Sequence, residues 1–233
     1  MARKRATAHV DDDPVPLPKR GPETVGSRLR LERERQGISL RELARRLDVS
    51  ASLISQVELG RATPSVGTLY AIVNELGISL DEVFDRAPVD GEGFGGGRMQ
   101  PRTSVQAGRS LKGAKPVVRH DERKAIQLDS GVRWERLTSV TEDGVDFLFV
   151  DYDVGGASCA QDSLMRHAGR EYGHVIEGRL GVTVGFETYE LGPGDSISFN
   201  STTPHRLFNA GDVPARGVWF VVGRGGDARM SPS

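Results

Sequence analysis

The sequence predicts a two-domain α + β protein, in which a helical N-terminal domain precedes an all-β C-terminal domain. Within residues 24–86, apolar side chains recur at the i, i+3, i+4, i+7 spacing of amphipathic helices. Within residues 117–224, they form short runs separated by turn residues, which is typical of strands. Residues 87–116 contain the run GEGFGGG, and this composition predicts a flexible linker between the two domains.

Composition and charge narrow the classes of function. The 233 residues include 31 basic and 32 acidic side chains, which excludes a uniformly basic coat for nucleic acid. Residues 24–62 nevertheless hold 8 basic and 5 acidic groups, so a local basic surface is allowed. We expect disordered or polar tails at residues 1–23 and 225–233.

The cysteine content and hydropathy indicate a cellular compartment. Cys159 is the single cysteine, so an internal disulfide is excluded, and this fits a reducing cytoplasm. No apolar run approaches the roughly 18 residues that a membrane-spanning helix needs, and the first 25 residues contain no signal-peptide pattern. We therefore expect a cytoplasmic protein without a membrane partner.

Five short helices are predicted in the N-terminal domain. The second begins at a capping box, in which Ser39 caps the helix and Glu42 returns to the Ser39 amide. A tight turn at Asp48 then leads to a third helix, which Ser50 can cap and which Gly60 ends. The outer face of the third helix carries small polar residues: Ser50, Ala51, Ser52, Ser55 and Gln56.

That outer face suits contact with DNA. Short side chains let the helix backbone approach the major groove, and Gln56 can make a bidentate contact with adenine. Ser50 and Ser52 lie where helix amides can meet phosphate, and Arg61 can contact a further phosphate. The alternative is that these helices only form a bundle; Glu58 in particular is expected to brace the domain.

Residues 26–84 resemble the lambda-repressor/Cro-type (XRE) family of helix-turn-helix domains. The resemblance covers residue types and spacings across all five helices, including Gly37, Ser39, Gly60 and Pro64-Ser65. In that family the third helix enters the major groove. The resemblance implies DNA contacts from the outer-face residues above, and it places Ser39 and Leu40 near the DNA backbone. Asp48 departs from the family, where glycine is common, but a left-handed conformation costs aspartate little.

The C-terminal domain contains a His-x3-Glu pair, His167 and Glu171, followed by His205. Two imidazoles and one carboxylate with open positions suit a divalent metal such as iron(II). We expect His167 and Glu171 on one hairpin and His205 on a later strand. The site could hold Fe, Zn, Mn or Ni, or it could be a metal-free polar pocket, so no cofactor is certain.

Residues 145–222 resemble the cupin superfamily. His167-x3-Glu171-x6-Gly178 matches its first motif after the initial histidine, and the segment from Gly194 to His205-x3-Asn209 matches the second. The resemblance implies a small β-barrel, or jelly roll, with an interior effector pocket at Met165, His167, Glu171 and His205. Met165 replaces the first histidine of the usual His-x-His pair, so at most three metal ligands remain.

The order of helix-turn-helix domain, linker and cupin resembles bacterial one-component regulators. This implies a DNA-binding transcription regulator, expected to be a repressor, that binds a palindromic double-stranded operator as a homodimer and senses a small-molecule effector. We expect no enzyme activity. The alternative is a mononuclear iron enzyme resembling hydroxypropylphosphonate epoxidase, which would use His167, Glu171 and His205. In a third class, an antitoxin-like DNA-binding partner, the cupin would be unexpected.

Overall fold

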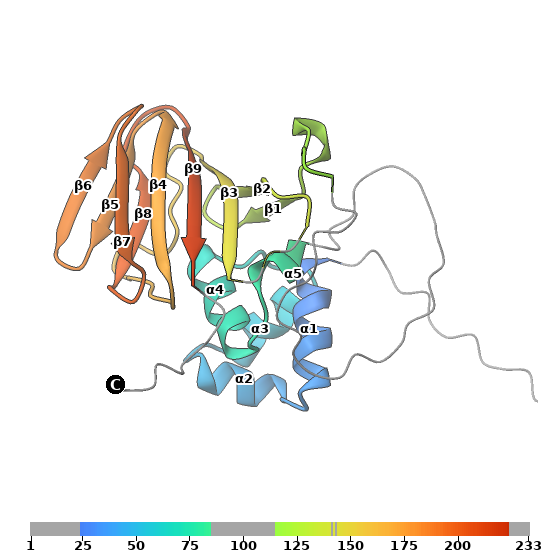
Figure 1. Ribbon diagram of the computed structural model, residues 1–233. Coiled ribbons are helices and arrows are strands. Elements are labelled where there is room, and N and C mark those ends of the chain that lie inside the picture. Colours follow the sequence, from blue (N-terminus) through green and yellow to red (C-terminus); the bar gives the residue numbers. More distant parts are fainter. Residues whose placement is uncertain (1–23, 85–114, 141, 143, 224–233) are drawn as a thin grey trace, which may run out of the picture.

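The computed structural model describes residues 24–84, 115–140, 142 and 144–223 (Figure 1). The predicted tails and the predicted linker up to residue 114 lie outside the described residues. The helical and the all-β regions that the sequence predicts are both present. No helix in the described part of the chain has the length and hydropathy to cross a membrane.

The N-terminal domain consists, within residues 24–84, of five short helices. These are α1 (Val25–Arg35), α2 (Leu40–Arg46), α3 (Ala51–Glu58), α4 (Val66–Glu75) and α5 (Leu80–Phe84). The side chains of Thr24, Ser39, Ser50 and Ser65 each accept a backbone N–H from the first turn of the helix they precede. The glycines after α1, α3 and α4 adopt positive φ and end those helices: Gly37, Gly60 and Gly77.

The predicted capping box at α2 forms only in part. Ser39 accepts the Glu42 amide as expected, at 3.1 Å. The Glu42 carboxylate accepts hydrogen bonds from the guanidinium groups of Arg45 and Arg46 at 2.7–3.0 Å. Charge-assisted bonds to two arginines are stronger than a single bond to a backbone amide, so they determine where this side chain lies.

A buried ion pair ties α1 to α3. Arg33 donates to both carboxylate oxygens of Glu58, at 2.6 and 2.8 Å, and also to the carbonyl of Ile38 at 2.7 Å. Both charged side chains are buried. Glu58 therefore braces the helical domain, as the sequence indicates, and does not reach the outer face of α3.

The C-terminal domain consists of two antiparallel sheets. In the described residues, a six-stranded sheet has the order β1-β2-β3-β9-β4-β7, and a three-stranded sheet has the order β6-β5-β8. A short 3₁₀ helix, η1 (His120–Glu122), precedes them. The strands are β1 (Ala125–Leu128), β2 (Val132–Arg136), β3 (Val145–Tyr152), β4 (Arg170–Glu177), β5 (Leu180–Val184), β6 (Glu187–Leu191), β7 (Ser196–Asn200), β8 (His205–Asn209) and β9 (Ala215–Val222).

Alternating burial along β3, β4 and β9 shows which side of the large sheet faces the core. Leu148 and Val150 on β3, Val175 on β4, and Trp219 and Val221 on β9 point inward. The helical domain lies at one end of these strands, with α4 next to the ends of β3 and β9 (Figure 1). The apolar cores of the two domains are continuous across this contact.

Candidate functional site

The outer face of α3 is open to solvent in this arrangement. Ser50, Ser52, Gln56 and Arg61 are exposed, and Ala51 and Ser55 are partly exposed. Ile54 and Val57 on the opposite face are buried at 1% and 2% exposure. The helix therefore separates an apolar inner face from a small polar outer face, as a helix that reads a DNA groove requires.

Two serines of the predicted DNA surface also build helix ends. The Ser50 side chain accepts the Leu53 amide, and the Ser39 side chain accepts the Glu42 amide. Ser39 is exposed at the start of α2, whereas Leu40 is half-buried. Between the two helices, Asp48 adopts a φ of 54°, the left-handed conformation that the sequence predicts.

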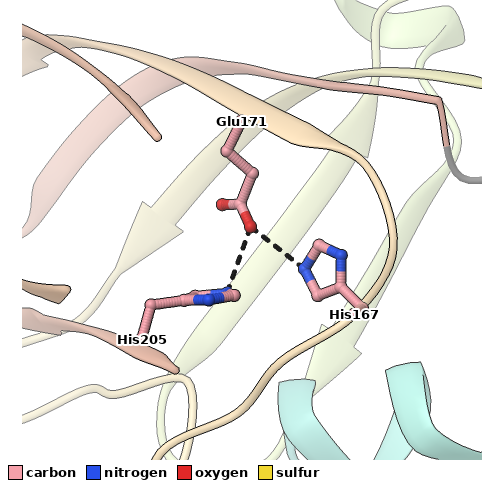
Figure 2. Close-up of side chains that lie close together, drawn as sticks. All are labelled: His167, Glu171 and His205. Atoms are coloured by element: carbon pink, nitrogen blue, oxygen red, sulfur yellow. Dashed lines mark ion pairs between the residues drawn. The ribbon is translucent and has the colours of Figure 1, made fainter. Parts of the chain in front are cut away.

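Three side chains meet inside the barrel: His167, Glu171 and His205 (Figure 2). His167 precedes β4 in an irregular segment, Glu171 lies on β4, and His205 begins β8. The prediction of His205 on a later strand is therefore correct, whereas His167 lies just outside the strand. The Oε1 atom of Glu171 lies 3.0 Å from His167 Nε2 and 3.1 Å from His205 Nε2.

Burial and charge make this group of atoms unusual. The three residues are at most 5% exposed. Burial opposes ionisation of Glu171, but the two imidazoles outweigh it and lower the pKa of the carboxyl group below its ordinary value. Burial lowers the pKa of His205, yet contact with Glu171 and the carbonyl of Thr203 raises it overall. The site thus holds a negative charge between two nitrogen bases.

The second oxygen of Glu171 is fixed by an indole. Trp219 on β9 donates its Nε1–H to Glu171 Oε2 at 2.7 Å. Gly173 on β4 makes room for the indole, because a Cβ atom there would lie 2.0 Å from the Trp219 ring. Each imidazole is fixed through Nδ1 by a carbonyl, that of Ala168 at 3.0 Å for His167 and that of Thr203 at 2.8 Å for His205. Such partners orient first-sphere ligands in metal sites.

The donor set fits a divalent metal ion. Glu171 Oε1, His167 Nε2 and His205 Nε2 are buried, and among the described residues they have no hydrogen-bond partner outside their own ion-pair contacts. All three ligand atoms lie within 4.8 Å of one another. Two imidazole nitrogens and one carboxylate oxygen are suitable ligands for iron, zinc, manganese or nickel. A bound ion would satisfy the three buried atoms together.

A cavity of about 20 Å³ adjoins this group, and its walls include His205, Glu171, Met165 and Trp219. Met165, which replaces the usual histidine, pairs with His205 through two backbone hydrogen bonds of 2.8 and 2.9 Å. The fourth predicted pocket residue therefore lies next to His205 and lines the same cavity as Glu171.

Sequence reasoning misses the contribution of the helical domain to this site. Tyr70 on α4 lines the same cavity and stacks on the His167 ring, with centroids 4.2 Å apart. A tyrosine on the inner face of an amphipathic helix has the pattern of a core residue, so no signal distinguishes it. Trp219 is also missed, because an inward aromatic residue on a strand is normally part of the core.

Comparison with known proteins assigns both domains. Residues 29–83 match the helix-turn-helix family model, and residues 148–221 match the cupin domain model. The HTH-type transcriptional regulator PuuR of Escherichia coli is 26% identical over 186 residues, which span 79% of this chain and 86% of PuuR.

Two solved structures align with 85% of this chain. A transcriptional regulator from Vibrio cholerae aligns with a TM-score of 0.56 and 20% identity, covering 85% of this chain and 94% of that one. This likeness shows the fold. Hydroxypropylphosphonic acid epoxidase from S. wedmorenis aligns with a TM-score of 0.38 and 20% identity, over 85% and 96% of the two chains, which is too weak to bear on function.

These matches confirm the predicted class: a two-domain α + β chain with an XRE-type helix-turn-helix domain and a C-terminal cupin. The chain therefore carries a helix-turn-helix domain followed by a cupin domain, and it is similar to the transcriptional regulator PuuR over most of its length.

Proposed function

We propose that this protein binds a specific DNA site through α3 and represses transcription until its cupin domain binds an effector. The exposed polar face of α3 carries the proposal, because it is the face that a helix-turn-helix domain inserts into the major groove. Gln56 then contacts a base edge, and Ser50, Ser52 and Arg61 contact phosphates or bases beside it. Ala51 and Ser55 allow close approach of the helix backbone.

The proposed binding unit is a homodimer on a palindromic operator. Two copies of α3 would enter successive major grooves about 34 Å apart, which is one turn of DNA. The helical domain alone presents one reading helix, so a second copy doubles the number of base contacts. Ser39 and Leu40, at the start of α2, would then approach the backbone of each half-site.

The cupin site is the proposed sensor. His167, Glu171 and His205 would hold a divalent ion, which supplies a Lewis-acidic centre with positions left for an effector. This chain contributes the three donors, the Trp219 hydrogen bond that orients Glu171, and the small cavity beside Glu171 and His205. An effector changes DNA affinity only if it binds two states of the protein with different affinity.

Selection of sheared genomic DNA from the host by the purified full-length protein tests this function. The salt concentration must be fixed near physiological, because nonspecific phosphate contacts weaken steeply with salt. We expect enrichment of one inverted-repeat sequence. Enrichment that does not exceed that of a Gln56→Ala/Arg61→Ala double variant, with both proteins folded, would refute it.

A second candidate is a metal-dependent oxidising enzyme. The specific observation in its favour is the group of three buried ligand atoms that face one another, which matches the 2-His-1-carboxylate set of iron oxygenases. Oxygen consumption by the iron-loaded protein with candidate substrates would support it. If variants that lack the three ligands bind specific DNA as the parent does, the site has no role in DNA binding. The enzyme candidate is then compatible with a separate regulatory function of the helical domain.

A further inference from the structure

Helix α4 of the DNA-binding domain is joined to the cupin by backbone hydrogen bonds. The first amides of a helix have no acceptor within that helix. One of them, the Gly67 N–H, donates to the carbonyl of Ser158 in the cupin at 3.1 Å. The Asp129 N–H, at the turn between β1 and β2, donates to the carbonyl of Pro64 at 2.9 Å. The start of α4 is therefore held at a defined position against the barrel.

The space between α4 and the barrel at Gly67 is just large enough for a Cβ atom. A Cβ atom on Gly67 would be in ordinary contact, at 3.7 Å, with the Cβ atoms of both Cys159 and Met165. A longer side chain would have to separate the domains. Because Gly67 lies in a helix with ordinary backbone geometry, such a substitution would act on the contact more than on the fold of either domain.

One turn further along α4, Tyr70 reaches the metal-type site directly. Its ring lies nearly parallel to that of His167, at 18° and 4.2 Å between centroids. The same ring makes an edge-type contact with Trp134 on β2, with centroids 5.4 Å apart. Tyr70 is 5% exposed, so these contacts are closed to solvent. A side chain of the DNA-binding domain thus packs on one of the three donor residues.

The size of the cavity decides what can bind without moving this wall. Its volume of about 20 Å³ is close to the space that one water molecule requires. Most of the wall comes from strands of the barrel, which are held by their ladder hydrogen bonds. Val66 and Tyr70 come instead from α4, which packs against the barrel without being part of its strand ladders. The α4 side is therefore the part of the wall that can move to enlarge the cavity.

We infer that Tyr70 limits the size of the ligand that the cupin site accepts. Through Tyr70, occupancy of the site also determines the position of the DNA-binding domain. A single ion fits with α4 docked, whereas an organic ligand at His167, Glu171 and His205 displaces Tyr70 and undocks α4. This inference rests on the proposed function, since it concerns regulation of the same site. Linkage requires the reverse effect as well: undocking α4 improves binding of any ligand that needs Tyr70 displaced.

Hydrogen exchange of α4 amides in the full-length protein measures docking without any DNA. Tyr70→Ala and His167→Ala each remove one ring of the stack, from opposite domains. We expect each to speed exchange of the α4 peptide by roughly two- to tenfold, the range for loss of one aromatic contact. The double variant should add little beyond either single change, because both remove the same interaction. His174→Ala, which removes an exposed imidazole on β4, is the matched control.

A side chain built into the cavity tests the size limit. Val150 lines the cavity from β3, and Val150→Phe places a ring where a ligand would lie. We expect faster α4 exchange in this variant and a return toward the parent rate when Tyr70→Ala is added, because the added ring then occupies the vacated space. Val150→Leu is the milder form if the larger change prevents folding, and Gly67→Leu undocks α4 from the helical side.

The inference fails if α4 exchange is unchanged in both single ring variants, or if their effects simply add. It also fails if Val150→Phe and Val150→Leu leave α4 docked while Gly67→Leu releases it. Failure of the proposed function would appear separately, as an absence of DNA enrichment from a protein whose α4 exchange behaves as expected. The two failures are thus distinguishable.

Discussion

Trp219 and Glu171 are joined by an indole N–H to carboxylate hydrogen bond of 2.7 Å between neighbouring strands. This bond engages Oε2 and leaves Oε1 facing the two imidazoles. The position of the donor set therefore depends on a residue that does not itself offer a ligand atom.

Trp219→Phe keeps an aromatic ring in the core but removes that N–H. We expect the affinity for Zn²⁺ to fall by about 10- to 100-fold, the usual effect of losing a partner of a metal ligand. Calorimetric titration of the full-length protein measures it. Trp134→Phe removes the other indole and leaves the Glu171 hydrogen bond intact, so equal affinities in the two variants would contradict this role.

Metal content tests the donor set itself. Protein purified with a divalent metal supplement should retain about one ion per chain, and His205→Ala should reduce this severalfold, because one of three ligands is lost. Elemental analysis after extensive dialysis measures the ratio. His174→Ala, on the exposed side of β4, should retain the parent content. If the metal content of His205→Ala equals that of the parent protein, His205 is not a metal ligand.

The buried pair between Arg33 and Glu58 should dominate the stability of the helical domain. Glu58→Gln leaves the Arg33 charge buried without a counter-charge, and we expect a loss of about 3–5 kcal/mol in the free energy of unfolding. Chemical denaturation followed by circular dichroism measures it. Glu75→Gln, which breaks a surface pair with Arg46 in the same domain, should change stability little. Comparable losses in both variants would contradict the assignment.

Arg61 should contribute to DNA affinity without contributing to selectivity. Arg61→Ala removes one phosphate contact, so we expect weaker binding to all sequences alike. The slope of log affinity against log salt concentration should become shallower by about one. Fluorescence anisotropy at several salt concentrations measures this. Arg179→Ala changes an exposed arginine of the cupin and should leave the slope unchanged. A loss confined to the specific site would instead assign Arg61 to base contact.

The elements of the helical domain follow closely from local sequence. Ser39, Ser50 and Ser65 precede amphipathic patterns and cap the helices that result, and Asp48 takes the left-handed turn. These features depend on interactions within a few residues. The Glu42 side chain is the exception, because nearby arginines outcompete the Ser39 amide.

The barrel and its site are less completely predictable from local sequence. The predicted apolar runs fall within β3, β4, β5, β7 and β9, whereas the short strands β1 and β6 lack a distinct pattern. The donor set could be named from its spacing and its resemblance to a known motif. The contact of Tyr70 with His167 joins residues 97 positions apart in different domains, so no local pattern records it. Packing between domains decides that part of the site.

The central claim is that Gln56 on α3 reads a base, and a direct test compares the DNA selectivity of the parent protein with that of Gln56→Ala. Both affinities, for the selected operator and for a scrambled duplex, are measured by anisotropy at one fixed salt concentration. Gln56 is exposed, so the variant should remain folded. We expect the difference in binding free energy between the operator and the scrambled duplex to shrink by about 1–3 kcal/mol in Gln56→Ala. The affinity for the scrambled duplex should change little. An unchanged ratio in the folded variant would contradict it.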